Sequence, residues 1–201
     1  DSNFAANGPE SFREVLNFYQ AETGQTADGI IAIDTTLFIN LLALTGPINL
    51  PEFNLTVNTD NFLDTVQYEV EKGYFERQGG KTENEPKKIL ATLMPLFTEK
   101  LATALSDTKN LRTTSKIFAD ALKQKNLLLY FSSEKIQSIV ESRNYGGKID
   151  SNQNFDYLYF HNTNIGGMKS SLNLNQTISD NITIADTGEI NHNRSEEHTS
   201  E

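Results

Sequence analysis

The sequence has no cysteine and no tryptophan, and only two methionines and five prolines among its 201 residues. Without thiols the chain cannot form disulfides, use a thiolate nucleophile or build a cysteine-based zinc site. No apolar run approaches the roughly 20 residues needed to span a bilayer, so no membrane-spanning segment is predicted within these residues. What is left is a chain of single-domain length whose folding depends on a hydrophobic core.

Basic residues are also scarce, since 17 Lys and Arg face 27 Asp and Glu, giving a formal net charge of −10. No basic stripe that could follow a phosphate backbone is visible, so nucleic acid is not an expected partner. The chain has no Gly-x-Ser-x-Gly motif and no Walker-type loop, which excludes the standard hydrolase and nucleotidase sites. His161, His192 and His198 do not have the spacing of metal ligands.

The densest apolar stretch, residues 28–51, reads DGIIAIDTTLFINLLALTGPINLP. Its β-branched run Ile30–Ile33 is typical of a strand buried on both faces, and we expect this strand to be among the most buried segments of the chain. A helical spacing of leucines follows, with Thr35 or Thr36 as the expected cap, and Gly46-Pro47 ends the helix. A second short strand is predicted at residues 48–50.

The rest of the chain alternates predicted helices and strands around this stretch. Helices are expected from Gly8-Pro9 to about Gly24, after Thr59 or Asp60, from Pro86 with a kink at Pro95, from about Lys109 to Lys125, and after Ser132 or Ser133. Strands are expected at 53–57, at 127–131, at 155–161, and in a hairpin turning at Asp186-Thr187-Gly188. The predicted fold class is α/β: a central mixed sheet of the strands near 28–34, 127–131 and 155–161, flanked by helices, with a C-terminal antiparallel hairpin.

The stretch 28–51 resembles the core of the bacterial family catalogued as domain of unknown function 4012. A second block, residues 156–169, DYLYFHNTNIGGMK, resembles that family's strand running into Asn-x-Gly-Gly-x-Lys. The opening Asp1-Ser2-Asn3-Phe4 is similar to its Asp-Ala-Asn-Trp. The strand-Asp-helix-Leu-Thr-Gly-Pro order also resembles, more weakly, the LytR-CpsA-Psr family. Those enzymes move wall glycopolymers from polyprenyl pyrophosphate carriers onto peptidoglycan.

The resemblance implies an extracytoplasmic domain of the cell envelope, held to the membrane by an anchor that precedes Asp1 in the full-length protein. It implies transfer or binding of polyprenyl-pyrophosphate-linked glycopolymer in cell wall biogenesis, with lipid-linked glycan or peptidoglycan as the partner. The alternative is a non-catalytic envelope module that binds wall polymer or a protein partner. Whether the chain is an enzyme stays open at this stage.

The first candidate site is the segment from Asn162 to Lys169, where the resemblance is concentrated on Asn164, Gly166, Gly167 and Lys169. Two adjacent glycines permit backbone conformations with positive φ that aim successive amides into one concavity, as in anion-binding nests. Lys169 would add a point charge to such a ligand or anion site. The alternative is a tight bend at which Lys169 is simply exposed.

A second candidate group is the basic set of Arg77, Lys81, Lys87 and Lys88. By a loose alignment, these residues fall where the glycopolymer transferases carry arginines for pyrophosphate. The alternative is a solvated loop followed by a helix start.

Asp28 and Asp34 bracket the predicted central strand. A carboxylate such as Asp34 at the end of a strand can hold a divalent metal such as Mg²⁺. It can equally cap the helix that follows, and both interpretations are carried forward.

The last eight residues, Arg194 to Glu201, read RSEEHTSE, which is what a common sequencing adapter gives when translated in one frame. We therefore interpret the chain as a metagenomic fragment: residues 1–193 form a single α/β domain truncated at both ends, and residues 194–201 are a non-native tail. Such a tail is expected to pack against nothing.

Overall fold

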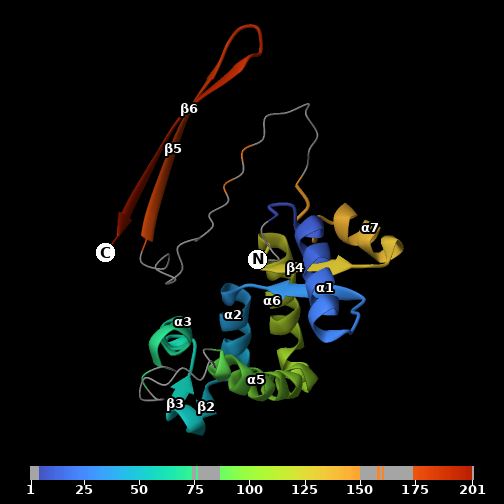
Figure 1. The fold of residues 1–201 in the computed structure, drawn as a ribbon, viewed down its shortest axis with the longest axis vertical. Coiled ribbons are helices and arrows are strands. Elements are labelled where there is room, and N and C mark those ends of the chain that lie inside the picture. Colours follow the sequence, from blue (N-terminus) through green and yellow to red (C-terminus); the bar gives the residue numbers. More distant parts are fainter. Residues whose placement is uncertain are drawn as a thin grey trace. The chain divides into compact units, whose positions relative to one another are not determined.

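The computed structural model describes residues 5–73, 76, 87–149, 158, 160 and 174–200. By their internal contacts the residues fall into two compact units, 1–149 and 150–201, which are considered separately below. The first unit holds the helices and two short sheets, and the second holds a single hairpin (Figure 1).

The first unit alternates helices with very short strands. In chain order its elements are α1 (Gly8–Thr23), β1 (Gly29–Ile33), α2 (Thr35–Thr45), β2 (Ile48–Leu50), η1 (Pro51–Phe53), β3 (Leu55–Val57), α3 (Phe62–Tyr68), η2 (Glu69–Gly73), α5 (Lys88–Ser106), η3 (Thr108–Asn110), α6 (Leu111–Gln124), β4 (Leu127–Phe131) and α7 (Glu134–Ser142).

The described residues form no central sheet, so that part of the predicted fold class is wrong. β1 pairs with β4 and β2 pairs with β3, both antiparallel, and each sheet has two strands. The predicted third strand at 155–161 lies outside the described residues apart from Leu158 and Phe160. What stands is a mixed α/β fold with small two-stranded sheets and a C-terminal antiparallel hairpin.

The core is centred on α2 and α5 and not on β1. Leu37 and Leu42 of α2 and Leu93 of α5 are almost fully buried. The Phe38 ring lies 4.4 Å from that of Phe62 and 4.3 Å from that of Phe97, measured between centroids. β2 and β3 add to the same core. A helix pair and a small hairpin therefore bury the side chains that the central sheet was expected to bury.

The expectation that the strand at 30–33 would be among the most buried segments is wrong. Ile31 is 69% exposed and Ile33 is 43% exposed. β1 and β4 form a two-stranded antiparallel ribbon, the β1–β4 ribbon. Both side chains lie on the same face of this ribbon as Leu127 and Leu129, their register partners in β4. Since α6 and α7 contact β4, that strand is covered whereas this face of β1 is not.

Both ends of α2 follow from local chemistry. Asp34, and not Thr35 or Thr36, is the N-cap: its Oδ1 accepts the Leu37 amide at 2.9 Å. At the other end Gly46 has φ 75° and ψ 177°, a region that is essentially restricted to glycine, and Pro47 then prevents any continuation of the helix. The predicted helix end at Gly46-Pro47 and the strand at 48–50 are confirmed.

Helix α5 is continuous from Lys88 to Ser106 with Pro95 inside it. Among the described helices it is the one long and apolar enough to cross a membrane, judged by length and composition alone. Its Ile89, Leu93 and Phe97 are buried in the core of the first unit. The apolar window of this helix is 22% buried, so the core accounts for only part of its composition.

The other predicted helices occur, with shifted ends. The turn before α3 shows why: the Asn58 side chain accepts the Asp60 and Asn61 amides, and Asn61 precedes the first helical residue. Thr59 and Asp60 therefore do not cap this helix as predicted. The strand at 127–131 and the helix after Ser133 are confirmed.

The second unit contains a hairpin of β5 (Leu174–Ile184) and β6 (Ile190–Ser200), joined by the predicted turn. The expectation that residues from Arg194 onward pack against nothing is wrong. Strand β6 continues through them in register with β5, and the Arg194 guanidinium lies 5.5 Å from the Phe160 ring centroid. Backbone hydrogen bonds do not depend on side-chain type, so an exposed strand of almost any sequence can extend such a ladder. The origin of the tail stays a prediction.

Candidate functional site

Asp34 is occupied by structural contacts. Beside the cap to Leu37, its Oδ2 accepts a hydrogen bond from Asn126 Nδ2 at 2.5 Å, which ties the start of α2 to the residue preceding β4. The described residues hold no group of three or more metal-ligating side chains, with Asp34 or elsewhere. The geometry agrees with the capping interpretation and gives the Mg²⁺ interpretation no further ligand.

The basic candidates are only partly described. Lys88 forms an ion pair with Glu52, and Lys87 is the N-cap residue of α5. A lysine already paired with a carboxylate has less net charge to offer a phosphate. Arg77 and Lys81 lie outside the described residues, so the structure does not bring the four together or separate them.

The segment with Asn164, Gly166, Gly167 and Lys169 also lies outside the described residues. Its interpretation as an anion nest therefore stays a prediction, and so does the alternative of a tight bend.

A groove of about 610 Å³ in the first unit was not anticipated from the sequence. It lies where the end of α2 and the start of β2 meet the C-terminal half of α5. Lys100 spans the junction, since its ammonium group donates to the Pro47 carbonyl at 2.7 Å. The lining residues are Leu44, Thr45, Pro47, Ile48, Asn49, Leu96, Glu99, Lys100, Thr103, Ala104, Asp107 and Asn110.

The groove combines an apolar wall with hydrogen-bonding side chains. Leu44, Ile48 and Leu96 supply the apolar part, and Glu99 and Asp107 supply carboxylates. Lys100 is the only cation among the described lining residues, and one of its three N–H donors is used by Pro47. With two carboxylates to one ammonium, the described lining carries net negative charge. It suits a neutral, hydroxyl-bearing ligand better than a polyanion.

The only sequence signal for this groove was the Leu-Thr-Gly-Pro run at the end of α2. Thr45 and Pro47 of that run line the groove, whereas Gly46 between them supplies the unusual backbone conformation. The residues on α5 could not be found from sequence, because they are separated from this run by more than forty positions and have no motif of their own.

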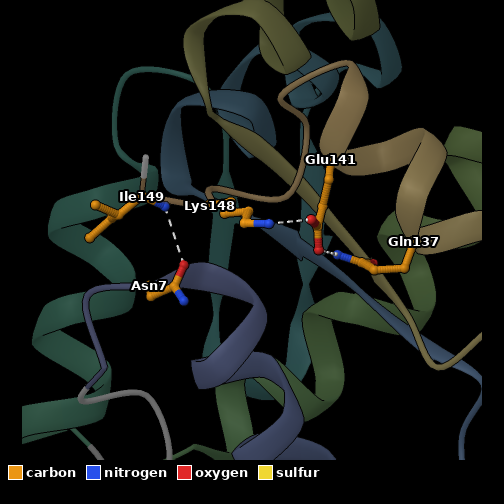
Figure 2. A network of polar contacts seen from close by, with 5 residues as sticks. All are labelled: Asn7, Gln137, Glu141, Lys148 and Ile149. Carbon is orange, nitrogen blue, oxygen red and sulfur yellow. Dashed lines mark hydrogen bonds and ion pairs between the residues drawn. The ribbon is translucent and has the colours of Figure 1, made fainter. Parts of the chain in front are cut away.

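A separate polar network lies at the β4 edge of the β1–β4 ribbon, the edge that faces away from β1 (Figure 2). Lys148 Nζ lies 2.6 Å from Glu141 Oε2, and Gln137 Nε2 donates to Glu141 Oε1 at 3.3 Å. The hydrogen bond from Lys148, followed by that from Gln137, holds the pKa of the Glu141 carboxyl below its usual value. Next to Lys148, the Ile149 amide donates to Asn7 Oδ1 at 3.2 Å.

This network is structural. The Gln137 side chain uses its Oε1 to accept the Phe131 amide at 2.9 Å, and so pairs an outward-facing N–H of β4. None of the five residues drawn in Figure 2 lines the groove. A carboxylate held ionised by a lysine, on a helix whose Gln137 also bonds to β4, is well placed to hold this edge of the two strands.

Comparison with known proteins gives one match. The profile of the family described as Protein of unknown function (DUF4012) matches residues 1–70. No curated protein and no solved structure matches the chain. The matched segment runs from α1 through α3 and includes the groove residues from Leu44 to Asn49, whereas residues 156–169 lie beyond it. The likeness to the LytR-CpsA-Psr family gains no support from these comparisons.

Proposed function

We propose that the first unit is a non-catalytic binding module of the bacterial cell envelope, and that its groove holds a saccharide segment of a wall polymer. The observation that carries the proposal is the groove itself, with its apolar wall and its mixed donors and acceptors, lined in part by residues 44–49 of the family-matched segment. Extracytoplasmic location and membrane anchoring in the full-length protein belong to the same proposal, and rest on the resemblance noted above.

Sugar chemistry fits this lining. A pyranose ring offers hydroxyl donors and acceptors around its rim and C–H groups on its faces. Glu99 and Asp107 can accept from hydroxyls, Lys100 can donate to them, and Leu96 and Leu44 can cover a ring face. Open grooves of this kind suit an extended chain, because a polymer can enter from the side without threading.

The second candidate is transfer of glycopolymer from a polyprenyl pyrophosphate carrier. It needs several cations or a metal at one place, and the groove supplies one lysine beside two carboxylates. Its support would come from the Asn164–Lys169 segment and Arg77. In that case Lys169→Ala should weaken binding of a pyrophosphate-bearing ligand by about 1 kcal/mol or more, the scale of a charge-assisted hydrogen bond.

The deciding experiment titrates the 201-residue protein with soluble peptidoglycan glycan strands and, separately, with geranyl pyrophosphate, monitored by backbone amide NMR. We expect the glycan to shift amides of Asn49, Thr103 and Asn110. Lys100→Met and Glu99→Gln should each weaken the glycan about fivefold, as expected for one lost hydrogen bond. Lys116→Met on α6, a strongly exposed lysine outside the groove, is the matched control and should bind normally.

The outcomes separate the two candidates. Glycan shifts at the groove that Lys100→Met weakens would support the binding module. Response to geranyl pyrophosphate alone, lost in Lys169→Ala and kept in Lys100→Met, would favour the transfer reaction instead. If neither ligand shifts a groove amide, the proposed function is wrong.

A further inference from the structure

The hydrogen-bond pattern of the β1–β4 ribbon leaves one edge of β1 open. The Ser132 amide donates to the Asp28 carbonyl at 2.8 Å, and the Asp34 amide donates to the Asn126 carbonyl at 3.0 Å. In an antiparallel pair, bonded and non-bonded residue pairs alternate. With the observed register, Gly29, Ile31 and Ile33 therefore turn their N–H and C=O groups away from β4.

The two edges of the β1–β4 ribbon differ in their hydrogen bonds. On the far side of β4, the Leu129 amide donates to the Tyr145 carbonyl at 2.9 Å and the Phe131 amide to Gln137. On the outer edge of β1, the described part of the chain offers no such partner to Gly29, Ile31 or Ile33. Ile31 and Ile33 also project from this strand as exposed apolar side chains.

We propose that the outer edge of β1 is a docking site for another polypeptide, which adds to the ribbon as an antiparallel strand carrying basic residues at both ends. An open edge with β-branched side chains is a ready template for strand addition, and proteins normally block such edges with lysine, proline or a bulge. Residues 29–33 contain no lysine, no proline and no bulge.

The charge at the two ends of the edge identifies the partner. Asp28 and Asp34 are exposed, lie on one face because they are six residues apart, and stand about 20 Å from each other along the strand. An added strand with lysine or arginine six residues apart places one cation opposite Asp28 and one opposite Asp34. The Asp34 oxygens already accept from Leu37 and Asn126, but both donors are neutral, so its negative charge remains. Apolar residues between them, at alternate positions, then lie beside Ile31 and Ile33.

The same charges disfavour a second copy of this chain. Full antiparallel pairing of two β1 strands would set Ile31 against Ile31 and Asp28 against Asp34 at both ends. Like charges directly opposite each other destabilise a strand pair, and the net charge of −10 adds long-range repulsion between copies.

The test uses the whole 201-residue protein and the peptide Thr-Lys-Val-Thr-Val-Thr-Val-Lys-Thr, whose central valine should pair with Ile31. We expect its addition to shift the amide resonances of Gly29, Ile31 and Ile33 and to slow their hydrogen exchange. Ile31→Lys should weaken the peptide about tenfold, because an edge lysine repels the cationic strand and exposes a charge to its apolar side. Ile139→Lys on α7, also an exposed isoleucine, is the control and should leave binding unchanged.

Two further measurements do not depend on how a protein variant folds. N-methylation of the central valine removes a hydrogen bond to Ile31 and should abolish binding. Replacing both lysines of the peptide by glutamate should weaken binding about fivefold or more, from two unfavourable cross-strand pairs.

The proposal is overturned by any of four results: no binding, equal binding of the glutamate peptide, a dimer in sedimentation that Ile31→Lys dissociates, or Ile31 and Ile33 amides already protected in the free monomer. The last result would mean that another stretch of the same chain holds the edge.

Discussion

β1 and β2 lie at the two ends of the same helix and are both short and apolar, but the structure uses them in opposite ways. Ile48 and Leu50 of β2 are 1% and 0% exposed, whereas Ile31 and Ile33 of β1 are 69% and 43% exposed. β2 lies against α5, and its partner β3 places Val57 in the same core. Among the described elements α1 contacts β1, whereas α6 and α7 contact its partner strand β4. Burial here depends on what packs against a strand, and composition alone does not reveal that.

The largest expected difference is in stability. Leu50→Ala should lower the free energy of unfolding by about 2–5 kcal/mol, because it opens a cavity in a packed core. Ile31→Ala should cost under about 1 kcal/mol, since its side chain is mostly in water already. Urea unfolding of both variants gives the two values side by side. Equal losses would remove the distinction between the strands.

The link between α2 and β2 should be the next most sensitive point. Gly46→Ala forces alanine into a backbone region that is essentially restricted to glycine, and should cost about 1–3 kcal/mol. A methyl group would meet no atom within 4 Å there, so the effect isolates backbone strain. Gly24, with φ 69° and equally open space, is the control: Gly24→Ala should cost less, about 1 kcal/mol, because left-handed helical angles are open to alanine at a modest penalty. The reverse order would show that Gly46 is not strained.

Substitutions at Asp34, which links β1 to α2, should lower the free energy of unfolding by less. Asp34→Ala removes the cap of α2 and the bond to Asn126, and should cost about 1 kcal/mol. Asp34→Asn keeps an acceptor for the Leu37 amide and should lower the free energy of unfolding by only about 0.3 kcal/mol. Thermal unfolding of the two variants checks this. If Asp34→Asn is as damaging as Asp34→Ala, the carboxylate charge does more than cap.

The smallest effect is expected at the network on the far edge of β4. Contact with Lys148 and Gln137 lowers the folded-state pKa of Glu141, so its contribution to stability is present above the usual pKa of a glutamate and is lost as the pH falls through the lowered value. Exposed ion pairs contribute at most about 1 kcal/mol. The ¹³C carboxyl shift of Glu141 should titrate at lower pH than in Lys148→Met. Identical titrations would mean that the lysine does not act on this carboxyl in solution.

Local features were predictable from the sequence where one or two residues decide them. Gly46 and Pro47 end α2, Ser133 precedes α7, and Asp186-Thr187-Gly188 turns the hairpin, each for a reason confined to a few neighbouring residues. Asp34 illustrates the limit: the sequence offered both a cap and a metal ligand, and the choice follows from the bonds that Asp34 accepts from the Leu37 amide and from Asn126, ninety-two residues away.

What depends on tertiary packing was not predictable. The run Ile30–Ile33 has the composition of an inner strand, and nothing in its own sequence says that α6 and α7 cover only β4. The groove is similar, because Lys100 meets Pro47 across fifty-three residues and neither belongs to a recognisable site motif. Long-range contacts of this kind leave no local periodicity to detect.

Cysteine reactivity tests the contrast between the strands most directly, because the chain has no cysteine of its own. Ile31→Cys and Ile48→Cys differ only in which end of α2 carries the thiol. In the folded protein, Ile31→Cys should react with a thiol reagent nearly as fast as it does in urea, whereas Ile48→Cys should be slowed by orders of magnitude and react only through unfolding. Slow labelling of Ile31→Cys, at the rate of Ile48→Cys, would contradict the account of β1 as an open edge.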